Sequence, residues 1–131
     1  MEHGVMRRLT GCALAVLALL GALGPMLAWA GDAASGERLF RTQCASCHST
    51  EPGRNMIGPS LAGVYGRAYG TAPGFRYSAA SRGAAVVWDE ESLDKYIANP
   101  RSVLPQAAMA YPGLRNAGQR ADILAYLQQV K

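Results

Sequence analysis

Two cysteines separated by two residues and followed at once by a histidine constrain this chain more than any other feature. They stand in the run Cys44-Ala45-Ser46-Cys47-His48. The C-x-x-C-H spacing is the attachment signature of c-type haem. On a helical turn, the two thiols can add across the two vinyl groups of the haem, and the adjacent histidine then lies beneath the iron. The sequence therefore predicts a fold built around one covalent haem c with an iron that alternates between Fe2+ and Fe3+.

The first thirty residues have the outline of a secretory signal. Arg7 and Arg8 precede an apolar run that extends to Ala30, and small residues flank Trp29 at its end. This arrangement predicts cleavage after Ala30. The chain of 131 residues is too short for two ordinary domains. We therefore expect a leader at 1–30, one domain at 31–131, and a periplasmic location.

The leader has two alternative interpretations. The apolar run is long enough to span a bilayer, so it could remain as a membrane anchor. Leu9-Thr10-Gly11-Cys12 superficially resembles a lipid-attachment site. However, the apolar region follows Cys12 instead of preceding it, which argues against a lipoprotein.

The two alternative uses of a C-x-x-C pair fit less well than haem. A thioredoxin-like dithiol needs a βαβ context, which the loop-rich sequence around the motif does not supply. Zinc needs four ligands as a rule. Because Cys12 and His3 lie in the leader, only Cys44, Cys47 and His48 would be left to bind it.

The charge of the chain is only mildly basic. Thirteen Lys and Arg against nine Asp and Glu give a formal charge of +4, which falls to +3 without the leader's two basic residues and one acidic residue. Two haem propionates would offset much of that charge. Nucleic-acid binding calls for Lys and Arg clustered on one face, so we expect no nucleic-acid partner.

The pattern of apolar residues predicts three main helices. A helix at 35–43 would be capped by Ser35, a second would follow Asp89 as its cap and extend to Ala98, and a third would cover about 118–130. Residues 49–87 are rich in Gly and Pro and show no sustained period. The predicted class is all-α, a small single domain with long loops wrapped around the haem.

The second iron ligand has few candidates. His48 is the only histidine after the leader, which leaves methionine, with Lys95 and Lys131 as weaker choices. Met56 follows His48 by only eight positions and should lie on the histidine side of the ring. Met109 lies in a proline-bounded loop far along the chain, so we expect Met109 to bind the iron from the opposite face.

Further residues outside the haem motif extend the pattern over almost all of 31–131. They are Gly36, Phe40, Gly58-Pro59, Gly66-Arg67, Ala72-Pro73-Gly74-Phe75, Tyr77, Trp88, Tyr96, Asn99-Pro100, Met109 and the segment 122–127. With these residues, the chain closely resembles the class I c-type cytochromes, that is, mitochondrial-type cytochromes c and their bacterial relatives. The resemblance implies the cytochrome c fold for 31–131.

The resemblance assigns roles near the histidine and between the terminal helices. Pro59 would offer its carbonyl to the free ring nitrogen of His48, which would fix the tautomer of the ligand. Gly36 would let the first helix approach the last, and Phe40 would pack near Tyr126.

The resemblance also assigns residues to the other cofactor-binding positions. Arg67, Tyr77 and Trp88 would donate hydrogen bonds to a buried propionate, because a buried carboxylate is costly unless it is paired. Tyr96 would lie near the Met109 sulfur.

Three departures from the family pattern stand out. Ser81 occupies a position where the family commonly has asparagine, and Ala107 one where it commonly has threonine, so the polar network there must differ. The lysine ring around the haem edge is mostly absent. Its remaining basic positions are Arg38, Arg101 and Arg115.

The function implied is that of a soluble, monomeric, single-haem carrier that moves one electron at a time in a respiratory or photosynthetic chain. It is expected to be an electron-transfer protein and not an enzyme. Its partners would be membrane redox complexes, such as a quinol-cytochrome c reductase and a terminal oxidase or a photosynthetic reaction centre. The alternative functions are those of a haem enzyme or gas-binding protein with an open iron, and of a dedicated subunit of one redox complex.

Overall fold

A computed structural model describes residues 30–79 and 81–131 of the chain. It contains four helices: α1 (Ala33–Gln43), α2 (Glu90–Ala98), α3 (Pro100–Val103) and α4 (Ala117–Gln129). In this part of the chain there is no strand, only an isolated antiparallel bridge between Ala68 and Val87. The all-α prediction is thus confirmed. The predicted leader falls almost entirely outside the described residues, so its cleavage stays a prediction.

Helix α1 begins two residues earlier than predicted, because Asp32 and not Ser35 caps it. One carboxylate oxygen of Asp32 accepts a hydrogen bond from the Ala34 N–H at 3.0 Å, and the other accepts from the Ser35 hydroxyl at 2.8 Å. A carboxylate has two acceptor oxygens, so it can bind the first helical turn twice. The prediction that Ser35 is the cap was wrong, since its side chain supports the cap from inside the helix.

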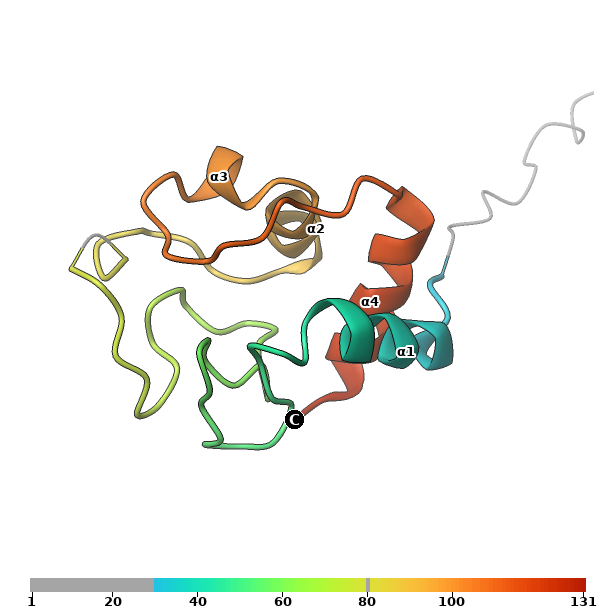
Figure 1. Cartoon of the computed structure of the whole chain (residues 1–131), viewed down its shortest axis with the longest axis horizontal. Coiled ribbons are helices and arrows are strands. Elements are labelled where there is room, and N and C mark those ends of the chain that lie inside the picture. Colours follow the sequence, from blue (N-terminus) through green and yellow to red (C-terminus); the bar gives the residue numbers. More distant parts are fainter. Residues whose placement is uncertain (1–29, 80) are drawn as a thin grey trace, which may run out of the picture.

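Helices α1 and α4 cross in close contact (Figure 1). Gly36 makes this possible, because a Cβ at that position would collide with the Asp122 carbonyl and would lie 2.9 Å from the Tyr126 Cβ. One turn later, the rings of Phe40 and Tyr126 pack with their centroids 5.6 Å apart. The close approach expected for Gly36 and the packing expected for Phe40 are both confirmed.

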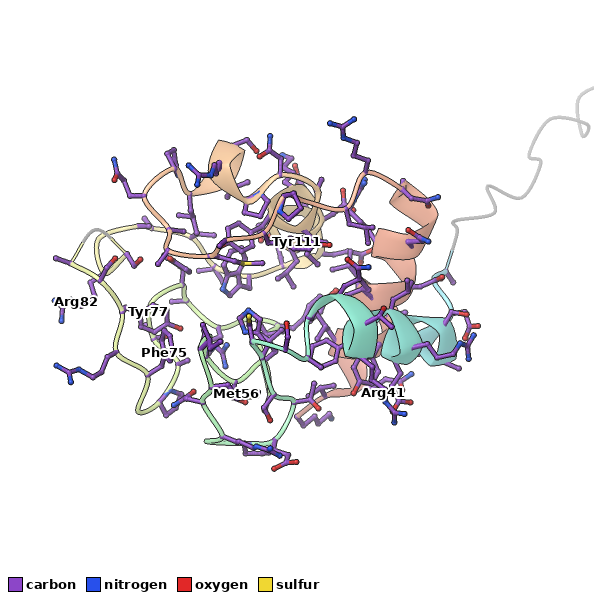
Figure 2. The ribbon with its side chains drawn as sticks, viewed as in Figure 1. Arg41, Met56, Phe75, Tyr77, Arg82 and Tyr111 are labelled. Atoms are coloured by element: carbon purple, nitrogen blue, oxygen red, sulfur yellow. The ribbon has the colours of Figure 1, made fainter. Side chains whose placement is uncertain are left out.

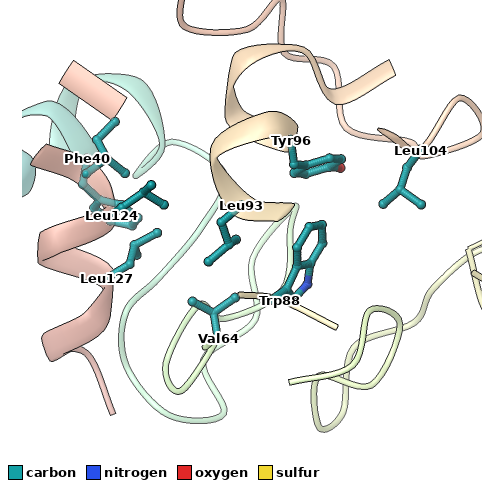
Figure 3. Packing of buried hydrophobic residues seen from close by; sticks show 9 residues of the cluster. Phe40, Val64, Trp88, Leu93, Tyr96, Leu104, Leu124 and Leu127 are labelled. Atoms are coloured by element: carbon teal, nitrogen blue, oxygen red, sulfur yellow. The ribbon is translucent and has the colours of Figure 1, made fainter. Parts of the chain in front are cut away.

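The hydrophobic core joins the helices to the loops. Figure 3 shows side chains from α1, α2 and α4 packed with residues from the connecting segments. The buried members are Phe40, Val64, Trp88, Leu93, Tyr96, Leu104, Ile123, Leu124 and Leu127. Three of them, Val64, Trp88 and Leu104, come from loop segments, so the loops are integral to the core.

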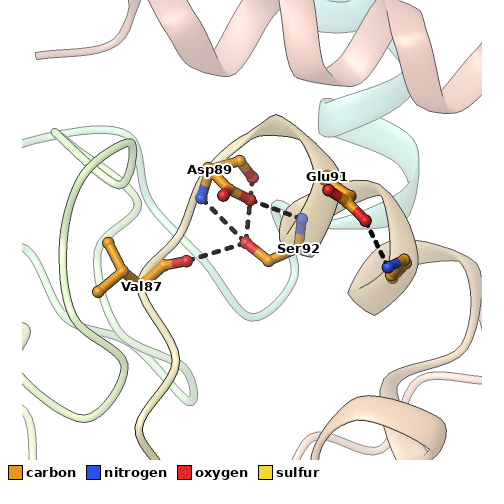
Figure 4. A network of polar contacts seen from close by, with 5 residues as sticks. Val87, Asp89, Glu91 and Ser92 are labelled. Carbon is orange, nitrogen blue, oxygen red and sulfur yellow. Dashed lines mark hydrogen bonds and ion pairs between the residues drawn. The ribbon is translucent and has the colours of Figure 1, made fainter.

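Helix α2 begins with a reciprocal cap (Figure 4). Asp89 accepts a hydrogen bond from the Ser92 backbone N–H at 2.8 Å, and the Ser92 hydroxyl oxygen accepts from the Asp89 N–H at 2.9 Å. That hydroxyl also donates to the Val87 carbonyl at 3.0 Å. The predicted cap at Asp89 is therefore confirmed, and two donors of the first turn are satisfied.

The short helix α3 was not predicted. The pair Asn99-Pro100 ends α2 as expected, but Pro100 then serves as the first residue of α3. Proline suits this position, because the first turn of a helix does not use its N–H groups and the fixed φ of proline is helical.

Two long loops occupy the side of the molecule away from the crossing of α1 and α4. One covers 49–89 and the other covers 104–116, and Figure 1 shows them facing one another across the molecule. Within residues 30–79 and 81–131, no helix is long and apolar enough to cross a bilayer.

Candidate functional site

The cysteine motif lies on a turn that continues directly from α1. The Cys44 N–H donates to the Phe40 carbonyl at 2.8 Å, and the N–H groups of Cys47 and His48 both donate to the Cys44 carbonyl. Neither Cys44 nor Cys47 is in a disulfide bond, so both sulfur atoms can form thioether bonds.

The orientation of His48 is fixed by the loop that follows the motif. Its Nδ1 lies 2.8 Å from the Pro59 carbonyl oxygen. A carbonyl can only accept, so Nδ1 must carry the proton, and the lone pair is on Nε2. A Cβ at Gly58 would collide with the imidazole ring. The backbone of Gly58 therefore lies against the ring, and Nε2 is free to bind a metal.

The electrostatic surroundings of His48 favour the neutral imidazole. Burial lowers its pKa, and the positive charge of Arg67 lowers it further, whereas the hydrogen bond to Pro59 acts in the opposite direction. The net direction is downward. A neutral imidazole is the form that can act as a metal ligand.

Arg67 has one buried donor with no acceptor. Its two terminal nitrogens donate to the carbonyls of Ala62 and Ser60 at 2.9 and 2.8 Å. In the described part of the chain, the buried Nε has no hydrogen-bond partner. Buried donors are nearly always paired in folded proteins. The unpaired Nε therefore fits an acceptor supplied by a bound group, such as a haem carboxylate.

Four aromatic rings form a continuous series beside Arg67. Tyr77 meets Tyr69 edge-on with centroids 5.7 Å apart, Tyr69 meets Trp88 in the same way at 5.7 Å, and Trp88 packs on Tyr96 at 4.9 Å. Three of these residues were predicted, and the structure brings them together. Tyr69 was missed, because no local pattern distinguishes it in a loop rich in glycine.

A cleft of about 400 Å³ opens where the two long loops face each other. Tyr69 and Ser81 lie on one side of it, and Leu104 and Ala107 lie on the other. The Tyr69 hydroxyl donates to the Ser81 hydroxyl oxygen at 3.0 Å, and the Ser78 hydroxyl lies 2.9 Å from the same atom. These hydroxyls form a polar network around Ser81, where the family commonly has asparagine, whereas Ala107 adds no polar group to it.

The two methionines within the described residues, Met56 and Met109, have different surroundings. Met56 is 40% exposed, and its N–H donates to the carbonyl of Gly58, the residue that lies against His48. Met109 is half-buried and packs against the core cluster. Figure 2 shows Met56 in the lower loop and Tyr111, two residues after Met109, in the upper one. Met56 therefore lies on the histidine side, whereas Met109 belongs to the opposing loop.

An all-α domain that presents C-x-x-C-H at the end of its first helix, with the histidine held by a loop carbonyl, defines a haem-binding protein of the c type. The comparison with known proteins agrees. The chain belongs to the cytochrome c family, whose model, described as "Cytochrome c", matches residues 33–131.

Relatives come from both eukaryotes and bacteria. The cytochrome c of Euglena viridis is 46% identical over 101 residues, which cover 77% of this chain and 99% of that protein. The cytochrome c of Chlamydomonas reinhardtii is 48% identical over 101 residues, covering 76% and 90%. The cytochrome c2 of Rhodopila globiformis is 46% identical over 101 residues, covering 77% and 95%.

The family gives this chain its cofactor and its general role. It is a single-haem electron-transfer protein, not an enzyme, and it holds one covalent haem c for which Cys44 and Cys47 supply the C-x-x-C-H motif. Proteins of this family interact with redox partners. The residues present fit the haem, because the free Nε2 of His48 and the unpaired Nε of Arg67 both point to a bound group.

Proposed function

We propose that His48 and Met109 bind the haem iron from opposite faces and that Cys44 and Cys47 hold the ring through thioether bonds. The observation that carries this proposal is the 2.8 Å contact between His48 Nδ1 and the Pro59 carbonyl. It leaves Nε2 as the free lone pair and makes the imidazole a more electron-rich ligand. Met109 is favoured over Met56 because it is half-buried in the opposing loop.

Arg67, Tyr77 and Trp88 are proposed to surround one propionate. The unpaired Nε of Arg67 supplies a charged donor. Burial raises the pKa of Tyr77, so its hydroxyl stays protonated at neutral pH and can donate. Trp88 is 6% exposed and shares the aromatic series with Tyr77 through Tyr69. Tyr96, at the end of that series, would lie near the Met109 sulfur.

When bound, the haem supplies one-electron chemistry at its iron. The chain sets the conditions for it. Methionine opposite histidine raises the potential. Loop residues packed around the ring would exclude water and so limit solvent rearrangement. With His48 and Met109 both holding the iron, the protein would carry an electron and would offer no open site to a substrate.

The carrier is proposed to act in the periplasm as a monomer, after cleavage of the leader behind Ala30. Its partners would be membrane complexes, namely a quinol-cytochrome c reductase and a terminal oxidase or photosynthetic reaction centre. Support comes from the signal-like sequence and from relatives named cytochrome c and cytochrome c2. Arg38, Arg101 and Arg115 are exposed and would meet an acidic face of such a partner.

The ligand assignment can be tested with the weak far-red absorption band of a sulfur-bound ferric haem. Met109→Ala should abolish this band, lower the potential and open the iron to added ligands. Met56→Ala is the matched control and should keep the band. Loss of the band in the Met56 variant alone would reverse the assignment. Haem that remains on the polypeptide in a denaturing gel would verify the covalent bonds.

The carrier role can be tested through the rate of electron transfer to a membrane reductase or oxidase at several ionic strengths. Because only three basic residues remain at the haem edge, the rate should fall with added salt, but less steeply than in a lysine-rich relative. Arg101→Glu with Arg115→Glu should slow the reaction at low salt. A rate that is indifferent to both substitutions would show that docking uses another surface.

A further inference from the structure

One partly buried ion pair links α2 to α4 and to the loop between α3 and α4. Arg120 donates to Asp94 through Nε at 2.6 Å and through a terminal nitrogen at 3.3 Å. Its other terminal nitrogen donates to the carbonyls of Leu114 and Arg115 at 3.0 and 2.9 Å. We call this assembly the Asp94–Arg120 brace. A planar guanidinium is suited to it, because a lysine cannot form the same fork of donors.

The brace is shielded from solvent more than the other ion pairs. The Arg120 side chain is 13% exposed and that of Asp94 is 39% exposed. On the same helix α2, the pair Glu91–Lys95 is 77% and 63% exposed. Exposed pairs contribute little to stability, whereas removal of one partner from a shielded, fully bonded pair is costly. Loss of one partner of the brace should therefore measurably weaken the contacts between α2, α4 and the loop. The exposed pair Glu91–Lys95 provides a control.

The carbonyls that Arg120 binds close the loop that carries Met109. At this end the Leu114 N–H also donates to the Ile97 carbonyl of α2 at 2.9 Å. Gly113 has a φ of +98°, and a Cβ there would collide with the Ala98 carbonyl. The end of the loop is thus fastened against the last turn of α2.

The middle of the same loop has few bonds of its own. Its beginning is held by the Leu104 N–H, which donates to the Pro100 carbonyl at 2.9 Å, and by the Ala107 N–H, which donates to the Leu104 carbonyl at 3.0 Å. Within the described residues, no backbone hydrogen bond involves 108–113. What holds this middle part is the packing of Met109 against the core cluster and a 3.4 Å hydrogen bond from the Tyr111 hydroxyl to the Gln43 side chain. With no backbone bond there, the position of Met109 also depends on what holds the two ends of the loop.

We propose that the Asp94–Arg120 brace positions Met109 and sets how often its sulfur leaves the iron. Asp94 and Arg120 act as positioning residues, because neither is placed at the haem. Loss of the brace would free the Leu114 end and increase the population in which Met109 is detached. This inference rests on the proposed ligation by Met109.

Imidazole added to the oxidised, haem-loaded protein measures that population, because it binds the iron only when Met109 is away. Apparent affinity scales with the fraction of molecules in the open form. Asp94→Asn and Arg120→Lys should each bind imidazole about tenfold more tightly, the effect expected for loss of a shielded charged pair. The double variant should bind imidazole little more tightly than either single variant, because both substitutions remove the same pair. Glu91→Gln should stay within about twofold of the native protein, as exposed pairs do.

Two further measurements separate positioning from general stability. Hydrogen exchange at the Leu114 N–H should accelerate in Asp94→Asn, because the fastened end of the loop opens more often. Global unfolding is followed in parallel by far-ultraviolet circular dichroism. A lower unfolding midpoint with unchanged imidazole affinity would overturn the proposal, and so would equal effects of Asp94→Asn and Glu91→Gln on that affinity.

Met109→Ala separates this inference from the ligand assignment. It should bind imidazole more tightly than any brace variant, because no sulfur competes. If Met109→Ala binds imidazole no more tightly than the native protein, the ligand assignment fails, and this inference fails with it. If Met109→Ala behaves as expected while both brace variants match the native protein, only the brace is refuted.

Discussion

The crossing of α1 and α4 and the two loops that face each other are stabilised in different ways. The helices meet through a glycine contact and through packed aromatic side chains such as Phe40 and Tyr126. The loops are also held by charged side chains that bind backbone carbonyls, such as Arg67 on those of Ser60 and Ala62, and Arg120 in the brace. Packing is sensitive to volume, whereas polar contacts are sensitive to the loss of one partner.

The helix pair and the loops also have different roles. The helix pair provides a rigid platform, and the cysteine motif extends directly from its first member. The loops provide the groups proposed to face the cofactor. A polar contact fixes direction as well as distance, and direction is what an axial ligand or a propionate donor needs. We therefore expect substitutions in the helix pair and in the loops to differ in the size of their effect on stability. Only those in the loops should also disturb the groups proposed to face the cofactor.

The largest effect is expected at Gly36. Gly36→Ala places a Cβ against the Asp122 carbonyl and the Tyr126 Cβ, so the two helices must separate. We expect the free energy of unfolding to fall by at least about 3 kcal/mol, the upper range for overpacking. Urea unfolding followed by circular dichroism will measure it. Gly83→Ala is the control, since nothing lies within 4 Å of a Cβ there.

If Gly36→Ala and Gly83→Ala were equally mild, the crossing would not be the rigid part of the fold. A loss of stability in Gly36→Ala but not in Gly83→Ala, with native haem attachment, would support the difference between the helix pair and the loops. It would show that the platform can be weakened without altering the motif it carries.

A smaller effect is expected at Arg67 on the loop side. Arg67→Met keeps most of the side-chain volume but leaves the Ser60 and Ala62 carbonyls without their donor. The free energy of unfolding should fall by about 2 kcal/mol, as for hydrogen bonds that involve a charged group. The reduction potential should also change, because a charged donor to the proposed propionate is lost.

Arg54→Met is the matched control for Arg67. Among the described residues, Arg54 pairs only with Glu51, and both side chains are mostly exposed. Its loss should therefore change stability by less than about 0.5 kcal/mol. Equal stability and equal potential in the two variants would contradict the role proposed for Arg67.

The smallest effect is expected at Asp89, and it should depend on pH. The hydrogen bonds from the Ser92 N–H and hydroxyl lower the pKa of Asp89 below its ordinary 3.8. A lowered folded-state pKa adds stability above pH 3.8, and this is lost as the pH falls through the lower folded value. Thermal unfolding of Asp89→Ala should differ from the native protein at neutral pH, and the difference should shrink in acid.

Asp89→Ser separates the charge from the hydrogen bond. Serine can still accept at the cap, so this variant should be closer to the native protein at neutral pH and should lose less stability in acid. A native-like acid profile in Asp89→Ala would show that the cap makes no pH-dependent contribution.

Sequence patterns predicted the haem motif and the cap of α2 better than they predicted the start of α1 or the presence of α3. The haem motif and the Asp89 cap are local, so neighbouring residues define them. The start of α1 was misplaced because Asp32 and Ser35 are both capping residue types, and only the structure shows that both act on one turn. Helix α3 was missed because proline ends one helix and equally begins the next.

The residues that the sequence could not reveal act over long separations. Tyr69 forms a hydrogen bond with Ser81, 12 positions away, and Arg120 forms one with a residue 26 positions away. No period or spacing connects such pairs. For Arg120, the surrounding residues predict only a helical position with a basic side chain. Its role depends on the approach of α2 and of the loop that precedes α4, which is a property of the assembled fold.

The crossing of α1 and α4 has a consequence for the order of events during biosynthesis. The Asp32 N–H donates to the Asp122 carboxylate across 90 positions, so α1 obtains its partner only when almost the whole polypeptide has been made. Contacts between segments this distant cannot form early. Cys44 and Cys47 immediately follow α1, so they lie in a nascent chain that cannot yet close its core. Haem attachment can therefore precede folding, and release of the last helix would then complete the structure around a cofactor already in place.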